Sequence, residues 1–206
     1  KYIDKVKYRK WLYFLPLIFL IWANSHMGVL AGGLIVFIFT LTETIIYFKQ
    51  PSFTSTEIEA LSKPELRNLW IISIVSALML LVNPHGISTF IYAYSHTKMK
   101  MLESVNEWQN PFAPRMDFGF IITLYKIFLF SGILVLYYAF KKKDLLFALM
   151  FIGFAVYSVR AIRFTVDYEM IMAFFIVISI SYIISLIKDV KIKNVINGNV
   201  LKGALG

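Results

Sequence analysis

The chain has 206 residues, 59% of them apolar and 17% aromatic, and it carries a formal net charge of +9. This composition excludes an ordinary soluble domain, and apolar runs that are continuous instead of alternating exclude a transmembrane β-barrel. No Cys is present, which excludes disulfides and thiolate metal sites. The positive charge fits basic loops that meet lipid head groups, so we expect no nucleic-acid partner.

Six segments approach the length of about 20 apolar residues that a helix needs to cross a bilayer. We therefore expect an all-α fold, a polytopic membrane helical bundle of about six transmembrane helices within a single transmembrane domain, residues 1–206. The third and fifth segments are short and are expected to tilt little or to stop partway across, against protein. The expected spans are residues 8–24, 29–48, 69–83, 118–140, 145–159 and 164–187.

The segments between these spans differ in character. Residues 84–117 are expected to form an outer loop, and Ser55 to Leu66 a short amphipathic surface helix capped by Ser55 or Thr56. The sequence begins with Lys1 and a basic decapeptide, without a visible signal peptide. We expect it to be a fragment of a longer chain.

The distribution of basic residues predicts the orientation of the bundle. With six spans, the N-terminal tail, the loop after the second span, the loop after the fourth span and the C-terminal tail share one side. Fifteen of the 21 Lys and Arg residues fall there, against five on the other side and Lys126 inside a span. Because cytoplasmic loops are rich in Lys and Arg, both termini are expected to be cytoplasmic. The predicted location is the plasma membrane of a prokaryote, as a multi-pass protein.

This topology gathers the unusual polar residues on the outer side. Asn24 and Gly28 suit a helical hairpin turn, but a turn does not require His26. His85 lies in an Asn-Pro-His-Gly turn and is also open to a capping role. Glu107 and Trp108 fit either a sugar platform or an interfacial anchor.

Three ionisable residues at the start of the last span are the most costly feature of the sequence. Arg160, Arg163 and Asp167 fall at helical spacing on one face. One interpretation is an Arg163–Asp167 ion pair at the interface, and the other is a pair of arginines that holds a phosphate. Ionisable groups at this depth are usually paired or line a cavity.

The three histidines raise the question of a metal site. His26, His85 and His96 all lie on the outer side, but their spacing matches no ligand motif such as HExxH. We expect no metal site from these residues and no certain cofactor, with a divalent metal left open.

Four segments, in this order, resemble bacterial polytopic membrane proteins of the C-type glycosyltransferase superfamily. WANSHMGVLAGG (residues 22–33) is similar to their W-x-N-x-H-x-G segment, although Met27 stands where a second Gly is common. LVNPHG (81–86) and NEWQNP (106–111) resemble an N-P-x-G and E-W-x-x-P pair, and SVRAIRF (158–164) resembles a late S-x-R-x-x-x-F segment. The resemblance covers most of residues 11–170.

The resemblance implies an enzyme that moves a sugar from a polyprenyl-phosphate donor to an acceptor at the outer membrane face. The family's base, typically an Asp in the first outer loop, would lie upstream of Lys1. The residues expected to bind substrate are Asn24, His26, His85, Glu107, Trp108, Arg160, Arg163 and Asp167. The expected partners are the polyprenyl-phosphate-linked sugar and membrane lipids. The alternatives are a membrane transporter and a non-catalytic membrane subunit or scaffold.

Overall fold

A computed structural model describes residues 10–49, 60–96, 99, 104–113 and 119–204. This part of the chain is helical and contains no β-strand. Three helices are long and apolar enough to cross a membrane: α3 (Val29–Lys49), α6 (Gly119–Lys142) and α8 (Arg163–Ala204), of which Arg163–Lys188 is the apolar part. The all-helical class is therefore confirmed, with three described helices that suit a membrane, whereas the six spans and the side of the termini stay predictions.

The other helices are shorter. They are α2 (Leu15–Ala23), α4 (Lys63–Met79), α5 (Ser88–His96), η2 (Asn106–Trp108) and α7 (Leu145–Ser158). The predicted outer loop over residues 84–117 thus contains α5 and η2, which the sequence analysis missed. Of the predicted surface helix at 55–66, residues 55–59 and both proposed caps lie outside the described residues. Its last residues, from Lys63, belong to α4.

Two helix boundaries differ from the prediction for identifiable reasons. The first apolar segment breaks at Tyr13 and Phe14, because Pro16 has no N–H to donate to the carbonyl of Leu12. The third segment starts earlier than predicted, where Ser62 and Glu65 form a capping box at the beginning of α4. It then tightens into i→i−3 bonds at residues 80–82 and does not stay α-helical to Asn83.

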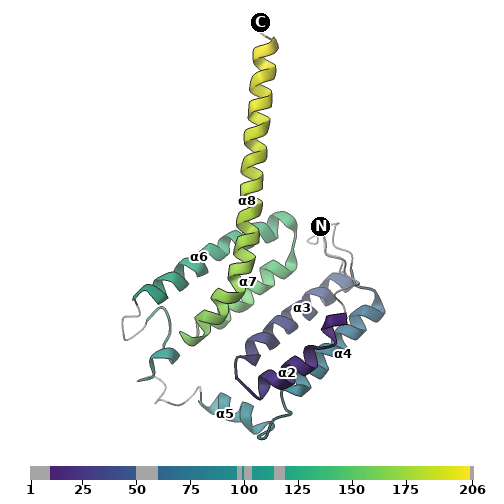
Figure 1. The fold of residues 1–206 in the computed structure, drawn as a ribbon, viewed down its shortest axis with the longest axis vertical. Coiled ribbons are helices and arrows are strands. Elements are labelled where there is room, and N and C mark those ends of the chain that lie inside the picture. Colours follow the sequence, from purple (N-terminus) through teal and green to yellow (C-terminus); the bar gives the residue numbers. More distant parts are fainter. Residues whose placement is uncertain (1–9, 50–59, 97–98, 100–103, 114–118, 205–206) are drawn as a thin grey trace.

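Six of the described helices form two groups of three (Figure 1). The first group contains α2, α3 and α4, the second contains α6, α7 and α8, and α3 packs on α7 between them. The core lies mainly in the second group, where Tyr125 and Tyr168 are completely buried and meet edge to face at 5.9 Å. The Tyr125 hydroxyl lies 3.0 Å from the Ser158 hydroxyl, and the Tyr168 hydroxyl donates to the carbonyl of Phe128 at 3.3 Å, so both buried phenols have hydrogen-bond partners inside the bundle.

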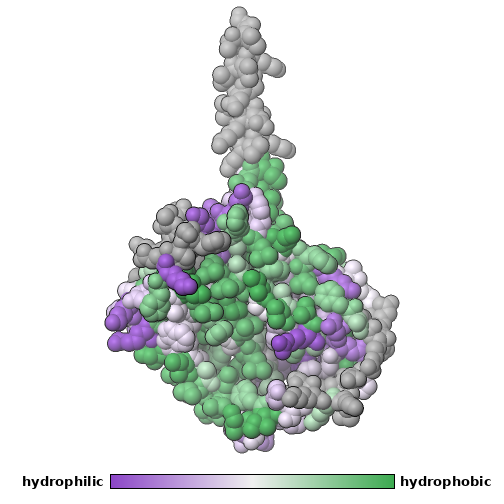
Figure 2. All heavy atoms as spheres, turned by 180° about the vertical axis from the view of Figure 1, so that it is seen from behind, coloured by the Kyte–Doolittle hydropathy of each residue, from purple (hydrophilic) through white to green (hydrophobic). Residues whose placement is uncertain are grey.

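Much of the face of the bundle seen in Figure 2 is apolar. Large apolar side chains on α6 and α8 face outward, for example Phe120 at 77%, Met170 at 74% and Phe130 at 69% exposure. An exposed apolar area of this extent marks a membrane or partner surface in a folded protein. The C-terminal part of α8 continues as a helix beyond the other helices (Figure 1).

A tight connection between α6 and α7 places their ends together. Lys143 adopts a positive φ of 53°, and the Asp144 N–H reaches back to the carbonyl of Ala139 at 2.9 Å, as in a Schellman motif. Asp144 then caps α7 by accepting bonds from the N–H groups of Leu146 and Phe147. Burial raises the pKa of this carboxyl above its ordinary 3.8, against these two hydrogen bonds, which lower it.

Substitutions at Asp144 should separate the cap from the charge. Asp144→Ala should lower the free energy of unfolding by about 1 kcal/mol, whereas Asp144→Asn, which caps equally well, should be neutral at low pH and more stable than the wild type once Asp144 is ionised. Because the folded state binds this proton more tightly than the unfolded state, the stability of the wild type should fall as the pH rises through the titration of Asp144, above 3.8. Thermal unfolding in detergent at several pH values checks both points. Equal stability of the Ala variant and the wild type would argue against the cap.

Candidate functional site

The connections at one end of the bundle are tied together by hydrogen bonds. The side chain of Asn24, in the α2–α3 turn, donates to the carbonyl of Val82 after α4 at 2.8 Å. The backbone N–H of Ile162, in the α7–α8 turn, donates to the carbonyl of Gln109 after η2 at 2.9 Å. Segments far apart in the sequence therefore meet at this end, as the arrangement of turns in Figure 1 also shows.

These segments line a partly open cavity of about 460 Å³, within the usual range for a small-molecule site. It lies between the two helix groups and receives residues from the α2–α3 turn, α5, η2, the end of α7 and the start of α8. Its lining combines one guanidinium, one carboxylate and one imidazole with aromatic and aliphatic side chains. The lining residues are His26, Met27, Gly28, Leu30, Thr89, Tyr92, Trp108, Tyr157, Arg163, Phe164 and Asp167.

Arg163 is the cation of this pocket. Its guanidinium lies 4.6 Å from the ring centroid of Trp108, and its Nη1 lies 3.7 Å from a carboxylate oxygen of Glu107. The side chains of Arg163 and Glu107 are 30% and 59% exposed, so water screens this ion pair and it contributes little to stability. Stacking on an aromatic face adds about 0.5–1 kcal/mol at such a site. The stacking on Trp108 thus orients the guanidinium of Arg163. Because the ion pair with Glu107 is weak, a ligand anion can replace Glu107 as the partner of Arg163.

Asp167 is the carboxylate of the pocket, and its partner is a tyrosine. The Tyr157 hydroxyl donates to Asp167 Oδ2 at 2.9 Å, and the Tyr157 ring packs on Phe164 at 4.5 Å between centroids. The predicted alternative of an Arg163–Asp167 ion pair therefore gives way, in the described part of the chain, to an Arg163–Glu107 pair. Asp167 lines the cavity one helical turn after Arg163, in an orientation that Tyr157 fixes.

His26 both closes its own turn and lines the pocket. Its Nδ1 accepts a hydrogen bond from the N–H of Gly28 at 2.8 Å, so the neutral imidazole carries its proton on Nε2. A side chain at residue 28 would clash with this ring, because a Cβ there would lie 2.7 Å from Nδ1. Gly32 similarly leaves room for the Trp22 ring. Gly28 and Gly32 thus make space for side chains of their own hairpin.

Four of the eight predicted binding residues line the cavity, namely His26, Trp108, Arg163 and Asp167. The other four are not among the lining residues. Asn24 donates to the carbonyls of Leu20 and Val82 and ties the turns together. Glu107 pairs with Arg163, whereas Arg160 is exposed and outside the lining.

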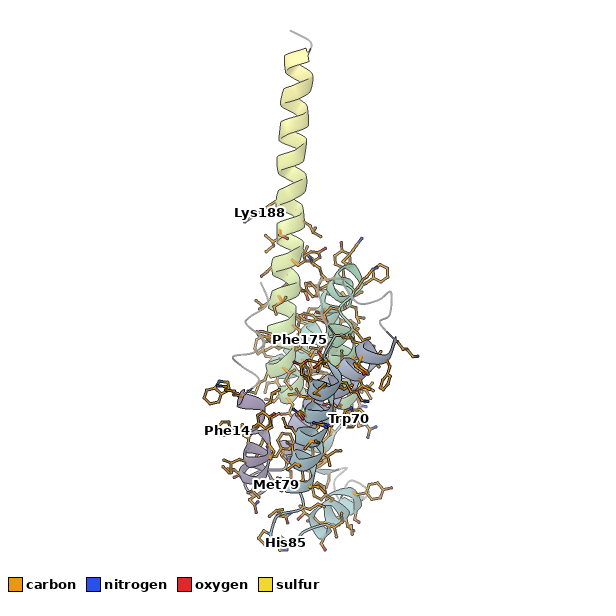
Figure 3. The ribbon with its side chains drawn as sticks, turned by 90° about the vertical axis from the view of Figure 1, so that its right-hand side faces the viewer. Phe14, Trp70, Met79, His85, Phe175 and Lys188 are labelled. Carbon is orange, nitrogen blue, oxygen red and sulfur yellow. The ribbon has the colours of Figure 1, made fainter. Side chains whose placement is uncertain are left out.

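His85 is exposed and lies toward the end of the body opposite Lys188 (Figure 3). Asn83 has the structural role in this turn. Its Oδ1 accepts bonds from the His85 N–H and the Thr89 hydroxyl, each at 2.9 Å, and so connects the end of α4 to α5.

The sequence analysis missed Tyr157 and the two lining residues of α5, Thr89 and Tyr92. Tyr157 directly precedes the SVRAIRF segment, and its position one turn from Arg160 was the available signal. No comparable pattern marks Thr89 and Tyr92. They lie among apolar residues, and the sequence predicted a loop in this segment instead of α5.

No group of three His, Asp or Glu side chains that could hold a metal ion occurs among the described residues. The side chain of His96 lies outside the described part. Searches against protein-family models, curated proteins and solved structures gave no match to this chain.

Proposed function

We propose that this chain is part of an integral membrane glycosyltransferase that moves a sugar from a polyprenyl-phosphate donor to an acceptor at the outer membrane face. The observation that carries the proposal is the combination, in one cavity, of Arg163, Asp167, His26 and aromatic rings at one end of an apolar bundle. A glycosyl phosphate carries the matching groups: an anion, hydroxyls and the apolar face of a sugar ring. The proposal adopts the six spans and the cytoplasmic termini as its topology.

Arg163 supports the phosphate part of this proposal. Guanidinium groups match phosphate oxygens in charge and geometry, and the existing partner, Glu107, is a screened and replaceable carboxylate. When the sugar leaves its carrier, negative charge develops on the departing polyprenyl phosphate. A guanidinium already stacked on Trp108 would stabilise that charge without first reorganising. His26 would add a hydrogen bond from its Nε2 proton.

The lengths of the helices support a ligand that arrives within the membrane. The 24 residues of α6 extend about 36 Å, enough for a hydrocarbon core of about 30 Å, but the 14 residues of α7 extend only about 21 Å. Both helices meet at the tight Lys143–Asp144 connection. If this connection lies at one membrane surface, Tyr157 and its pocket lie within the depth of the bilayer, where a lipid-linked donor has direct access.

The proposal is tested with the full-length protein in lipid nanodiscs and a polyprenyl-phosphate hexose labelled in its sugar. Because the acceptor is unidentified, the experiment records both transfer of label to membrane acceptors and release of free hexose to water. We expect saturable donor binding together with one of these activities. Absence of both binding and turnover would contradict the proposal. Movement of unmodified labelled hexose across proteoliposomes would instead support a transporter.

A further inference from the structure

We infer that Tyr92, on α5, is the platform on which the sugar of the donor stacks, an inference that rests on the proposed function. One face of a pyranose ring carries C–H groups, and an aromatic ring that covers this face removes apolar surface from water. Four aromatic rings of Phe, Tyr and Trp line the cavity. They are Tyr92, Trp108, Tyr157 and Phe164.

Three of these rings are already engaged inside the protein. One face of Trp108 is covered by the guanidinium of Arg163, which lies 4.6 Å from the ring centroid. Tyr157 and Phe164 pack on each other at 4.5 Å between centroids, and Phe164 also meets Trp108 edge to face at 6.0 Å. All three rings are partly buried. They therefore hold the charged side chains of the pocket in place and have little ring surface left for a ligand.

Tyr92 differs from these rings in its exposure. Its side chain lines the cavity and yet is 62% exposed. A tyrosine gives a large and rigid contact area at low entropic cost, because it has only two side-chain torsions to fix. Tyr92 is therefore the lining ring with the most surface to offer to a ligand.

Thr89 adds a polar group on the same face of α5. It precedes Tyr92 by three residues, so the two side chains lie one above the other on the helix, and both line the cavity. The Thr89 hydroxyl donates to Oδ1 of Asn83 at 2.9 Å, which orients its oxygen as an acceptor for a ligand O–H. An aromatic ring beside an uncharged acceptor suits the apolar face and the hydroxyls of a neutral sugar.

This wall of the cavity differs in charge from the wall that α8 forms. The residues of α5 in the lining are uncharged, whereas α8 contributes the cation Arg163. In the proposed donor the sugar is bonded directly to the phosphate, so a phosphate held at Arg163 keeps the sugar in the same cavity. The carrier phosphate is thus recognised by α8 and the sugar by α5.

Tyr92→Ala tests this assignment in the full-length protein in lipid nanodiscs, with two probes: labelled polyprenyl-phosphate hexose and polyprenyl phosphate without a sugar. Affinity for the first probe should fall about 10-fold, as expected for the loss of one stacked ring. Affinity for the second should stay within about 3-fold of the wild type, because the phosphate contacts Arg163. Tyr92→Phe keeps the ring and should retain most of the affinity for the sugar-bearing probe. Tyr94→Ala is the matched control, since Tyr94 is 64% exposed on the same helix but outside the lining.

The outcomes separate this inference from the function on which it rests. Wild-type affinity of Tyr92→Ala for the sugar-bearing probe would overturn the sugar platform and leave the proposed function intact. An equal loss of affinity for both probes would also overturn it, since Tyr92 would then support the pocket as a whole. If the wild type binds neither probe, both ideas fail. If Tyr92→Ala does not fold, Tyr92→Leu takes its place: a selective loss in the Leu variant but not in the Phe variant supports the platform, and equal affinities in both overturn it.

Discussion

Replacement of Arg163 by alanine is expected to lower sugar transfer by about 100-fold to 1,000-fold while leaving membrane insertion unchanged. This range is typical for removal of one group that stabilises a developing negative charge in an enclosed site. The side chain lines the cavity and stacks on Trp108, and its ion-pair partner within the described part of the chain is the screened Glu107, so its loss removes the pocket's cation with little structural cost. Turnover of the labelled donor and the Kd for polyprenyl phosphate provide the measurement.

Matched variants show whether the charge, the shape or the position of Arg163 is responsible for the effect. Arg163→Lys keeps the charge but loses the planar fork and the stacking, so an intermediate activity is expected. Arg67→Ala removes the same charge from an exposed position on α4 outside the pocket lining and should have no effect on turnover. Arg160→Ala tests whether Arg163 alone holds the phosphate or whether the pair suggested by the sequence does. A loss of turnover in this variant would support the pair. Normal turnover in Arg163→Ala would contradict the phosphate role.

Glu107 provides a second check on the same ion pair. If a ligand phosphate replaces the carboxylate at Arg163, then Glu107→Gln removes a competitor, and affinity for polyprenyl phosphate should stay equal or rise. A large fall in affinity would instead mean that Glu107 itself binds the substrate, as the sequence analysis expected.

The sequence predicted the helical class because apolar runs of membrane length have few alternatives. The predicted bounds of α3, α6 and α7 lie within two residues of the observed ones, since charged or turn-forming residues end each run. The predicted bounds of the first and third apolar segments were less accurate. The effect of Pro16 and the capping box at Ser62 are local signals that a count of apolar residues overlooks.

The pocket was predictable only in part. Arg163, Asp167, His26 and Trp108 stood out because each is costly or unneeded in an apolar or turn context. Which of the arginines would face inward depended on the turn at residues 159–162 and on the docking of Gln109 against Ile162, both tertiary features. Similarly, the pairing of Asp167 with Tyr157 depends on how α7 and α8 pack, and no spacing rule within one helix could give it.

A close approach between α6 and α7 gives the second large prediction. Gly132 of α6 lies directly against the ring of Phe151 on α7, and a Cβ added there would overlap the ring. In an open helix, Gly→Ala would be stabilising by about 1 kcal/mol. Here the overlap should reverse the sign, and Gly132→Ala is expected to lower the free energy of unfolding by about 1–3 kcal/mol, as overpacking does. Thermal unfolding of the purified protein in detergent measures the change.

Two controls identify the cause. Gly153→Ala on α7 places a Cβ 2.6 Å from Cδ1 of Ile38, the mobile end of a flexible side chain, so rotation of Ile38 should absorb the contact at small cost. Phe151→Leu should relieve the clash, and the double variant Gly132→Ala/Phe151→Leu should be more stable than the sum of the single effects predicts. Gly132→Ala with wild-type stability, or strictly additive effects, would show that α6 and α7 separate freely. The α7 end that carries Tyr157 would then be less firmly fixed beside the pocket than the packing indicates.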